Sequence, residues 1–145
     1  VALVLNLVFR LGVRRRVVLP WTPGVDGSQA VVDFIETAAG RWGARRDVMT
    51  RVEAVVQQAL EAVVDHGSVT GQVLLELSFD EFDVDARLTY DGAELVLPTW
   101  LPTEEAVLDG SGVLALAGYL VRQQSDRVLS GSAAGRSWLE IRFRH

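Results

Sequence analysis

Apolar and polar positions recur along this chain with two different periods, which predict helices and strands in a definite order. In 26–42 and 47–67 the apolar residues recur every three or four positions, as the buried stripe of a helix requires. Asp47 is a suitable residue to cap the second of these helices, and Gly67 a suitable one to end it. A third helical pattern follows at 113–124.

Shorter segments rich in β-branched residues, or alternating between apolar and polar, predict five strands. They lie at 16–21, 72–79, 84–90, 126–131 and 137–145. The order β, α, α, β, β, loop, α, β, β predicts an α+β fold, a two-layer α/β sandwich in which the helices cover one face of a mixed, mainly antiparallel sheet.

The segment before the first strand has a different character. Residues 1–13 are apolar except for Asn6 and Arg10, and they run into three consecutive arginines at 14–16. Positive charge after an apolar run is typical of the cytoplasmic end of a membrane-spanning helix, although about 20 residues are needed to cross a bilayer. We therefore expect 1–15 to be either the end of a transmembrane helix or an N-terminal extension, such as an amphipathic helix or edge strand, and 16–145 to be one domain.

Composition excludes several classes of site. The chain has 145 residues, no cysteine, two histidines and a net charge of -5. Disulfides and thiolate metal sites are impossible without cysteine, and we expect no metal site. The negative charge argues against binding nucleic acid through its phosphates. The first residue is Val, which suggests a fragment of a longer protein.

Three segments have the order and spacing of a nucleotide pocket. They are VVQQALEAVVDHG at 55–67, LTYDG at 88–92 and DGSG at 109–112. With the predicted layout, they resemble the ATPase fold shared by histidine kinases, gyrase-like enzymes and Hsp90, and in particular the small anti-sigma-factor serine kinases. The resemblance covers about residues 16 to 144. It implies an ATP site between the second helix and the glycine turn.

The working groups of that family are replaced here. The resemblance places the catalytic Glu at Gln58 and the magnesium-binding Asn, four residues later on the same helix face, at Ala62. Glutamine cannot accept a proton at neutral pH, and alanine offers no metal ligand. We therefore expect no catalytic residue and no bound metal at these positions.

The other two motifs are retained in part. The family's Asp-x-Gly, whose Asp binds the adenine amino group, corresponds to Tyr90, Asp91 and Gly92, so that Asp91 could substitute only after a shift of one residue. The glycine turn is present as Gly110 and Gly112, where backbone N–H groups at a helix start attract phosphate. Gln58, Ala62, Asp91, Gly92, Gly110 and Gly112 form the candidate cofactor site, with ATP as a weak ligand if any cofactor binds.

Some other residues have simpler explanations. His66 is expected to end the helix, and Glu61 and Asp65 to form a solvated acidic face. Trp100 lies in the segment corresponding to the family's lid and is open to two interpretations, a partner-binding anchor or local packing.

Two functions are compatible with these residues. The string LNLVFRLGVRRR resembles the end of the last span of bacterial xanthine/uracil permeases, which implies a regulatory or interaction domain at the cytoplasmic face of the inner membrane, as the tail of such a transporter. Its partner would be another protein or its own transporter domain. The alternative is a cytoplasmic ATP-binding serine kinase of the anti-sigma-factor type. The family resemblance also implies a homodimer.

Overall fold

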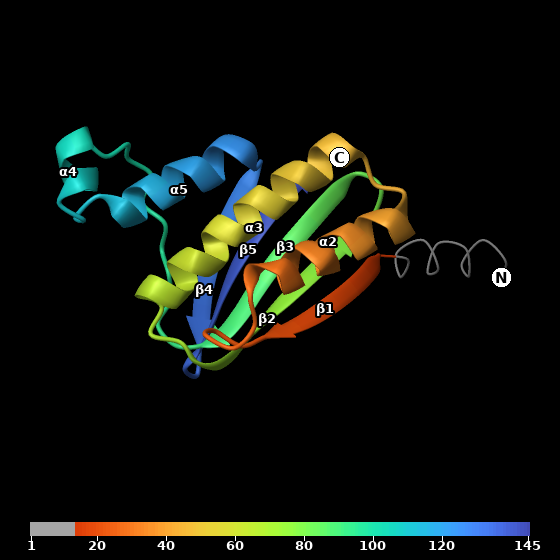
Figure 1. Cartoon of the computed structure of the whole chain (residues 1–145), viewed down its shortest axis with the longest axis horizontal. Coiled ribbons are helices and arrows are strands. Elements are labelled where there is room, and N and C mark those ends of the chain that lie inside the picture. The colour runs from red at the N-terminus through yellow and green to blue at the C-terminus, as the bar shows by residue number, and fades with distance from the viewer. Residues whose placement is uncertain (1–13) are drawn as a thin grey trace, which may run out of the picture.

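The computed structural model describes residues 14–145, which form five strands and four helices in two layers (Figure 1). The strands are β1 (Arg15–Trp21), β2 (Thr70–Phe79), β3 (Asp83–Asp91), β4 (Arg127–Ala133) and β5 (Arg136–Arg144). The helices are α2 (Ser28–Trp42), α3 (Arg46–His66), α4 (Glu104–Leu108) and α5 (Val113–Gln124). Residues 1–13, to which the predicted membrane-span end belongs, lie outside the described part.

All four strand pairings in residues 14–145 are antiparallel, in the order β1-β2-β3-β5-β4. The helices α2, α3 and α5 lie on one face of this sheet (Figure 1). The predicted α+β class and the two-layer α/β sandwich are confirmed, and the layout is consistent with a histidine-kinase-like ATPase fold. The sheet was predicted to be mixed and mainly antiparallel, and within the described residues it is antiparallel throughout.

One core lies between the sheet and the helices. Leu75, Leu88 and Leu139 are direct neighbours across β2, β3 and β5, and each is at most 1% exposed. Successive side chains of a strand alternate between its two faces, so this row belongs to the helix-covered face. The helix residues buried against this face are Val31, Ile35, Ala38, Trp42, Val48, Val52, Val55, Val56, Ala59 and Val63.

The opposite face of the sheet carries a buried charge. The Asp85 side chain is 8% exposed, and its carboxylate accepts hydrogen bonds from Arg142 Nε at 2.8 Å and Nη2 at 3.1 Å, and a further one from Arg14. Hydrogen bonds and charge attraction from Asp85 raise the pKa of Arg142, so the guanidinium stays charged. The carboxylate is thus buried with its counter-charges supplied by β5 and by the residue before β1.

The helix ends differ in part from the prediction. Helix α3 begins at Arg46 after Arg45, so the prediction of Asp47 as its cap was wrong. Asp47 instead lies in the first turn, where a negative charge is favoured by the helix dipole, and it pairs with Arg45 at 2.7 Å. Gly67 ends α3 as predicted. The five-residue α4 was not predicted, because its pattern is too short for a helical period to emerge.

Candidate functional site

The shallow groove between α3 and α5 contains the two positions that correspond to the family's base and magnesium ligand. Gln58 and Ala62 line a cavity of about 190 Å³, together with His66, and α5 contributes Leu116 and Leu120 from the other side. Ala62 is 5% exposed, and its methyl group offers nothing to a cation. Within residues 14–145, no group of three or more acidic or histidine side chains is placed to hold a metal ion.

The acidic residues of this helix lie at the margin of the groove. Glu61 and Asp65 also line it, and both are exposed, in agreement with a solvated face. His66 is the last residue of α3 and is exposed as well. These side chains leave the groove apolar on the α5 side and polar only at its rim.

Tyr90 lies at the position where the family resemblance implies the adenine-binding carboxylate. Its side chain is completely buried, and its hydroxyl donates a hydrogen bond to the Ala93 carbonyl at 2.8 Å. Burial raises the pKa of the Tyr90 phenol, so the group remains a neutral donor. The position at which the resemblance implies a carboxylate thus holds a buried aromatic ring, whose hydroxyl donates to the backbone.

Two glycines allow this close packing. A Cβ atom on Gly67 would lie 2.6 Å from the Val63 carbonyl oxygen and 3.1 Å from the Tyr90 ring. A Cβ atom on Gly92 would lie 2.3 Å from the Gly67 carbonyl oxygen and 3.2 Å from the same ring. The end of α3 and the end of β3 thus meet around the tyrosine with no space for a larger residue.

Asp91 is placed apart from this region. It follows the inward-facing Tyr90 in β3, so its side chain is on the other face of the sheet, where it is exposed. There it pairs with Arg136 Nη1 at 3.2 Å. The structure does not bring Asp91 together with Gln58 and Ala62.

The glycine turn has the predicted position but its amides are occupied. Gly112 is the N-cap of α5, and its N–H donates to the Ala106 carbonyl at 2.8 Å. The N–H of Gly110 donates to the Val107 carbonyl at 3.2 Å, and the N–H of Ser111 to the Asp109 carboxylate at 2.8 Å. The amides of the turn itself are therefore engaged within the protein, and a phosphate bound there would have to displace these acceptors.

The charge on the turn also disfavours an anion. Hydrogen bonds from Ser111 lower the pKa of Asp109, which therefore stays negative at neutral pH. Phosphate would have to approach this carboxylate directly.

The segment between β3 and α5 is fastened to the body of the domain. Arg122 Nη2 of α5 donates to the Leu97 carbonyl at 2.9 Å. A Cβ on Gly118 would lie 2.6 Å from the Pro98 carbonyl oxygen, so the segment runs directly over the helix. In this arrangement α5 itself packs on α3 and covers the groove that contains Ala62.

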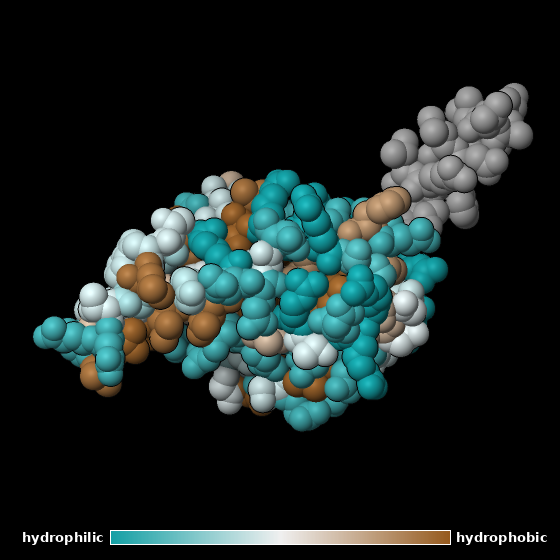
Figure 2. Space-filling view, turned by 90° about the horizontal axis from the view of Figure 1, so that it is seen from above, coloured by the Kyte–Doolittle hydropathy of each residue, from teal (hydrophilic) through white to brown (hydrophobic). Residues whose placement is uncertain are grey.

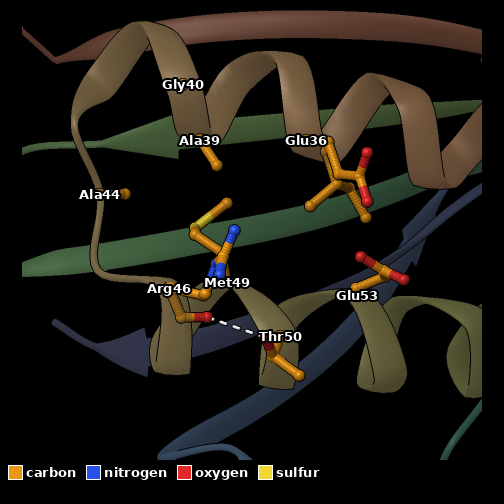
Figure 3. Close-up of a pocket in the computed structure, with 9 residues that line it drawn as sticks. Glu36, Ala39, Gly40, Ala44, Arg46, Met49, Thr50 and Glu53 are labelled. Carbon is orange, nitrogen blue, oxygen red and sulfur yellow. Dashed lines mark hydrogen bonds between the residues drawn. The ribbon is translucent and has the colours of Figure 1, made fainter.

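A larger cavity, of about 440 Å³, lies elsewhere, between α2 and α3 (Figure 3). Ile35 and Met49 form its apolar part, and Glu36 and Glu53 face one another across it from the two helices. It contains none of the six predicted cofactor-site residues.

Comparison with known proteins adds little to this description. No family model matches the chain, and a search of curated proteins finds no match either. Among solved structures, the chain is similar to the Acinetobacter baumannii histidine kinase AdeS, with a TM-score of 0.47 and 12% sequence identity over 97% of this chain and 73% of that chain. What the domain can do must therefore be argued from its own residues.

Proposed function

We propose that this domain is a regulatory or interaction module without phosphoryl transfer, a degenerate relative of the anti-sigma-factor serine kinases. The observation that carries the proposal is the buried Tyr90, which fills the adenine position with a side chain of the protein itself. The occupied amides of Gly110 and Gly112 and the replacement of the metal ligand by Ala62 support it.

Phosphoryl transfer needs several groups of the protein around one phosphate, and the described residues of this groove do not supply them. Catalysis of this reaction depends on positioning the phosphates and on neutralising their charge with metal ions and cationic groups. Here the groove offers a methyl group on Ala62 and an amide on Gln58, and its carboxylates, Glu61 and Asp65, lie at the rim. Phosphoryl transfer here would require other residues to supply the missing base and the missing metal ligand, whereas binding a partner requires only an exposed surface.

An isothermal titration of the domain with ATP and magnesium at millimolar concentration tests this proposal. We expect no heat of binding and no nucleotide-dependent rise in the melting temperature, because a ligand that binds only the folded state must stabilise it. A saturable titration would contradict the proposal, and release of ADP in the presence of a candidate protein substrate would favour the serine kinase.

We further propose that the domain is the cytoplasmic tail of a xanthine/uracil permease-like transporter. The support is the apolar segment 1–13 followed by arginines. No helix within residues 14–145 has the length and apolar character to cross a membrane. Two of the arginines are engaged within the domain, Arg14 with Asp85, and Arg16 with Glu76 at 2.7 Å.

The natural gene provides the test of this second proposal. We expect its product to be found in the membrane fraction, and a gene that encodes no spans upstream of Val1 would refute the idea.

A homodimer through the first strand and first helix, which the family resemblance implies, remains a proposal as well. The edge of the sheet at β1 has no neighbouring strand among residues 14–145, and a groove of about 400 Å³ between β1 and α2 is lined by Val17, Leu19 and Phe34. Sedimentation velocity over a range of concentrations would show whether the full chain associates, and a monomer at every concentration would rule the dimer out.

A further inference from the structure

The end of the domain formed by α4 and the start of α5 exposes several large apolar side chains. Leu108 is 81% exposed, Leu101 62%, Trp100 55% and Val113 44%. Figure 2 shows apolar residues gathered at this narrow end of the molecule, opposite the end at which the described chain begins. We call Trp100, Leu101, Leu108 and Val113 the apolar tip.

The apolar tip is held as one unit by backbone packing. A Cβ on Gly112 would lie 2.8 Å from Pro102 and 3.0 Å from Ala106, so the loop before α4, α4 itself and the first residue before α5 are in contact. Thr103 caps α4 by accepting a hydrogen bond from the Ala106 N–H at 3.1 Å. Of the two interpretations of Trp100, the structure favours the anchor, since more than half of the residue is exposed.

Carboxylates form the margin of the tip. Glu104 and Glu105 lie in the first turn of α4, Asp109 follows its last residue, and all three are exposed. None of them forms an ion pair with a described residue. The tip therefore combines four exposed apolar side chains with three exposed carboxylates of the same segment, unpaired among the described residues.

We propose that the apolar tip docks a basic amphipathic segment of a partner protein. This inference rests on the proposed function and names the chemistry of the partner. Trp is enriched in binding hot spots, and exposed apolar patches rimmed by polar residues mark interaction sites. Charge complementarity selects the partner, because Lys or Arg beside its apolar residues would meet Glu104, Glu105 and Asp109.

The same charges argue against a membrane as the occupant. Anionic headgroups attract basic surfaces, and three carboxylates around the inserting side chains would be repelled from them. A protein segment with basic residues removes this repulsion and covers the apolar side chains in one step.

Peptide titrations of the full chain test the proposal. The probes are an 18-residue helical peptide of Leu and Lys at amphipathic spacing and a matched peptide in which Glu replaces Lys. We expect the Leu/Lys peptide to bind at least tenfold more tightly than the Leu/Glu peptide, and its affinity to fall as salt is raised. Amide chemical shifts should change mainly at residues 99–114.

Variants separate a specific site from general attraction to an acidic protein. Trp100→Ala, Leu108→Ala and the double change Glu104→Lys/Glu105→Lys should each weaken binding at least tenfold. The matched control is Glu36→Lys/Glu53→Lys in the cavity between α2 and α3, which alters net charge equally and should leave the affinity within twofold. The changed side chains are at the surface of loops or helices, so folding should be retained.

Several results would overturn the inference. Equal weakening by the two double changes would show attraction by net charge alone, and absence of binding by either peptide would remove the site. Tighter binding to phosphatidylserine vesicles than to the Leu/Lys peptide would assign the tip to a membrane instead. ATP titrations of the same samples test the proposed function separately, since nucleotide binding and peptide binding are measured as independent isotherms.

Discussion

Replacing Tyr90 tests how much its buried ring stabilises the domain. Tyr90→Phe removes one hydrogen bond, from the hydroxyl to the Ala93 carbonyl at 2.8 Å, and keeps the ring. Because Ala93 is exposed, water can solvate the freed carbonyl, and we expect a loss of about 0.5–1.5 kcal/mol in the free energy of unfolding. Tyr90→Ala also removes a completely buried ring, which should cost about 3–5 kcal/mol.

Urea denaturation followed by circular dichroism measures both losses. Tyr119→Phe is the matched control, because Tyr119 is 36% exposed and its change should stay within about 0.5 kcal/mol. A loss below about 1 kcal/mol for Tyr90→Ala would refute the conclusion that this ring is tightly packed between the ends of α3 and β3.

The pH dependence provides a second readout for the same residue. Burial raises the pKa of Tyr90 in the folded state above the ordinary value of 10.0. As pH rises above about 10, the unfolded chain loses this proton while the folded chain retains it, so the stability conferred by the neutral phenol declines. The wild-type protein should thus lose stability in this range faster than Tyr90→Phe, and parallel profiles would contradict the assignment.

Three further predictions concern other parts of the domain. Asp85→Asn should lower the free energy of unfolding by about 1.5–3 kcal/mol, since it weakens charge-assisted hydrogen bonds to two arginines. The control Asp65→Asn changes an exposed residue and should alter the free energy little, so equal effects of the two variants in urea denaturation would count against the buried ion pair. Gly92→Ala should lower the free energy of unfolding by about 1–3 kcal/mol, because the new Cβ meets the Gly67 carbonyl. Gly40→Ala inside α2 has open space and should raise it by up to about 1 kcal/mol, so the melting temperatures of the two variants should move in opposite directions. The Asp109 carboxyl should titrate below its ordinary pKa of 3.8 in a carbon-detected NMR titration, and an ordinary midpoint would show that the Ser111 hydrogen bonds are absent in solution.

The sequence predicted the layers well because the two hydrophobic periods are strong. Helix α3 has nine buried residues at helical spacing, and the inward positions of β5 alternate without interruption from Ser137 to Phe143. Such patterns follow directly from burying one face of an element. The cap of α3 was misplaced by two residues because Arg45 precedes the helix without a side-chain cap, while Asp47 nearby has the chemistry of one.

The candidate site was less predictable because its state depends on contacts between distant segments. The substitutions at Gln58 and Ala62 were visible in the chain, but the burial of Tyr90 arises where Gly67 and Gly92 meet, and no local pattern encodes that approach. The aromatic residue before Asp91 was the available signal, since a buried strand position is better suited to a ring than to a carboxylate. Likewise, the N–H groups of Gly110 and Gly112 donate to carbonyls of α4, a helix that the sequence did not reveal.

Pro20 gives the edge of the sheet a particular character. It lies in β1, opposite Leu74 of β2, at the margin of the sheet. Proline carries no N–H, and in a sheet it is tolerated where that missing donor would have pointed outward. The exposed row of donors along β1 is therefore interrupted near its end, so an incoming strand cannot extend the hydrogen-bond ladder along the whole length of β1. The interruption protects this margin of the protein against fibril-like stacking of many copies.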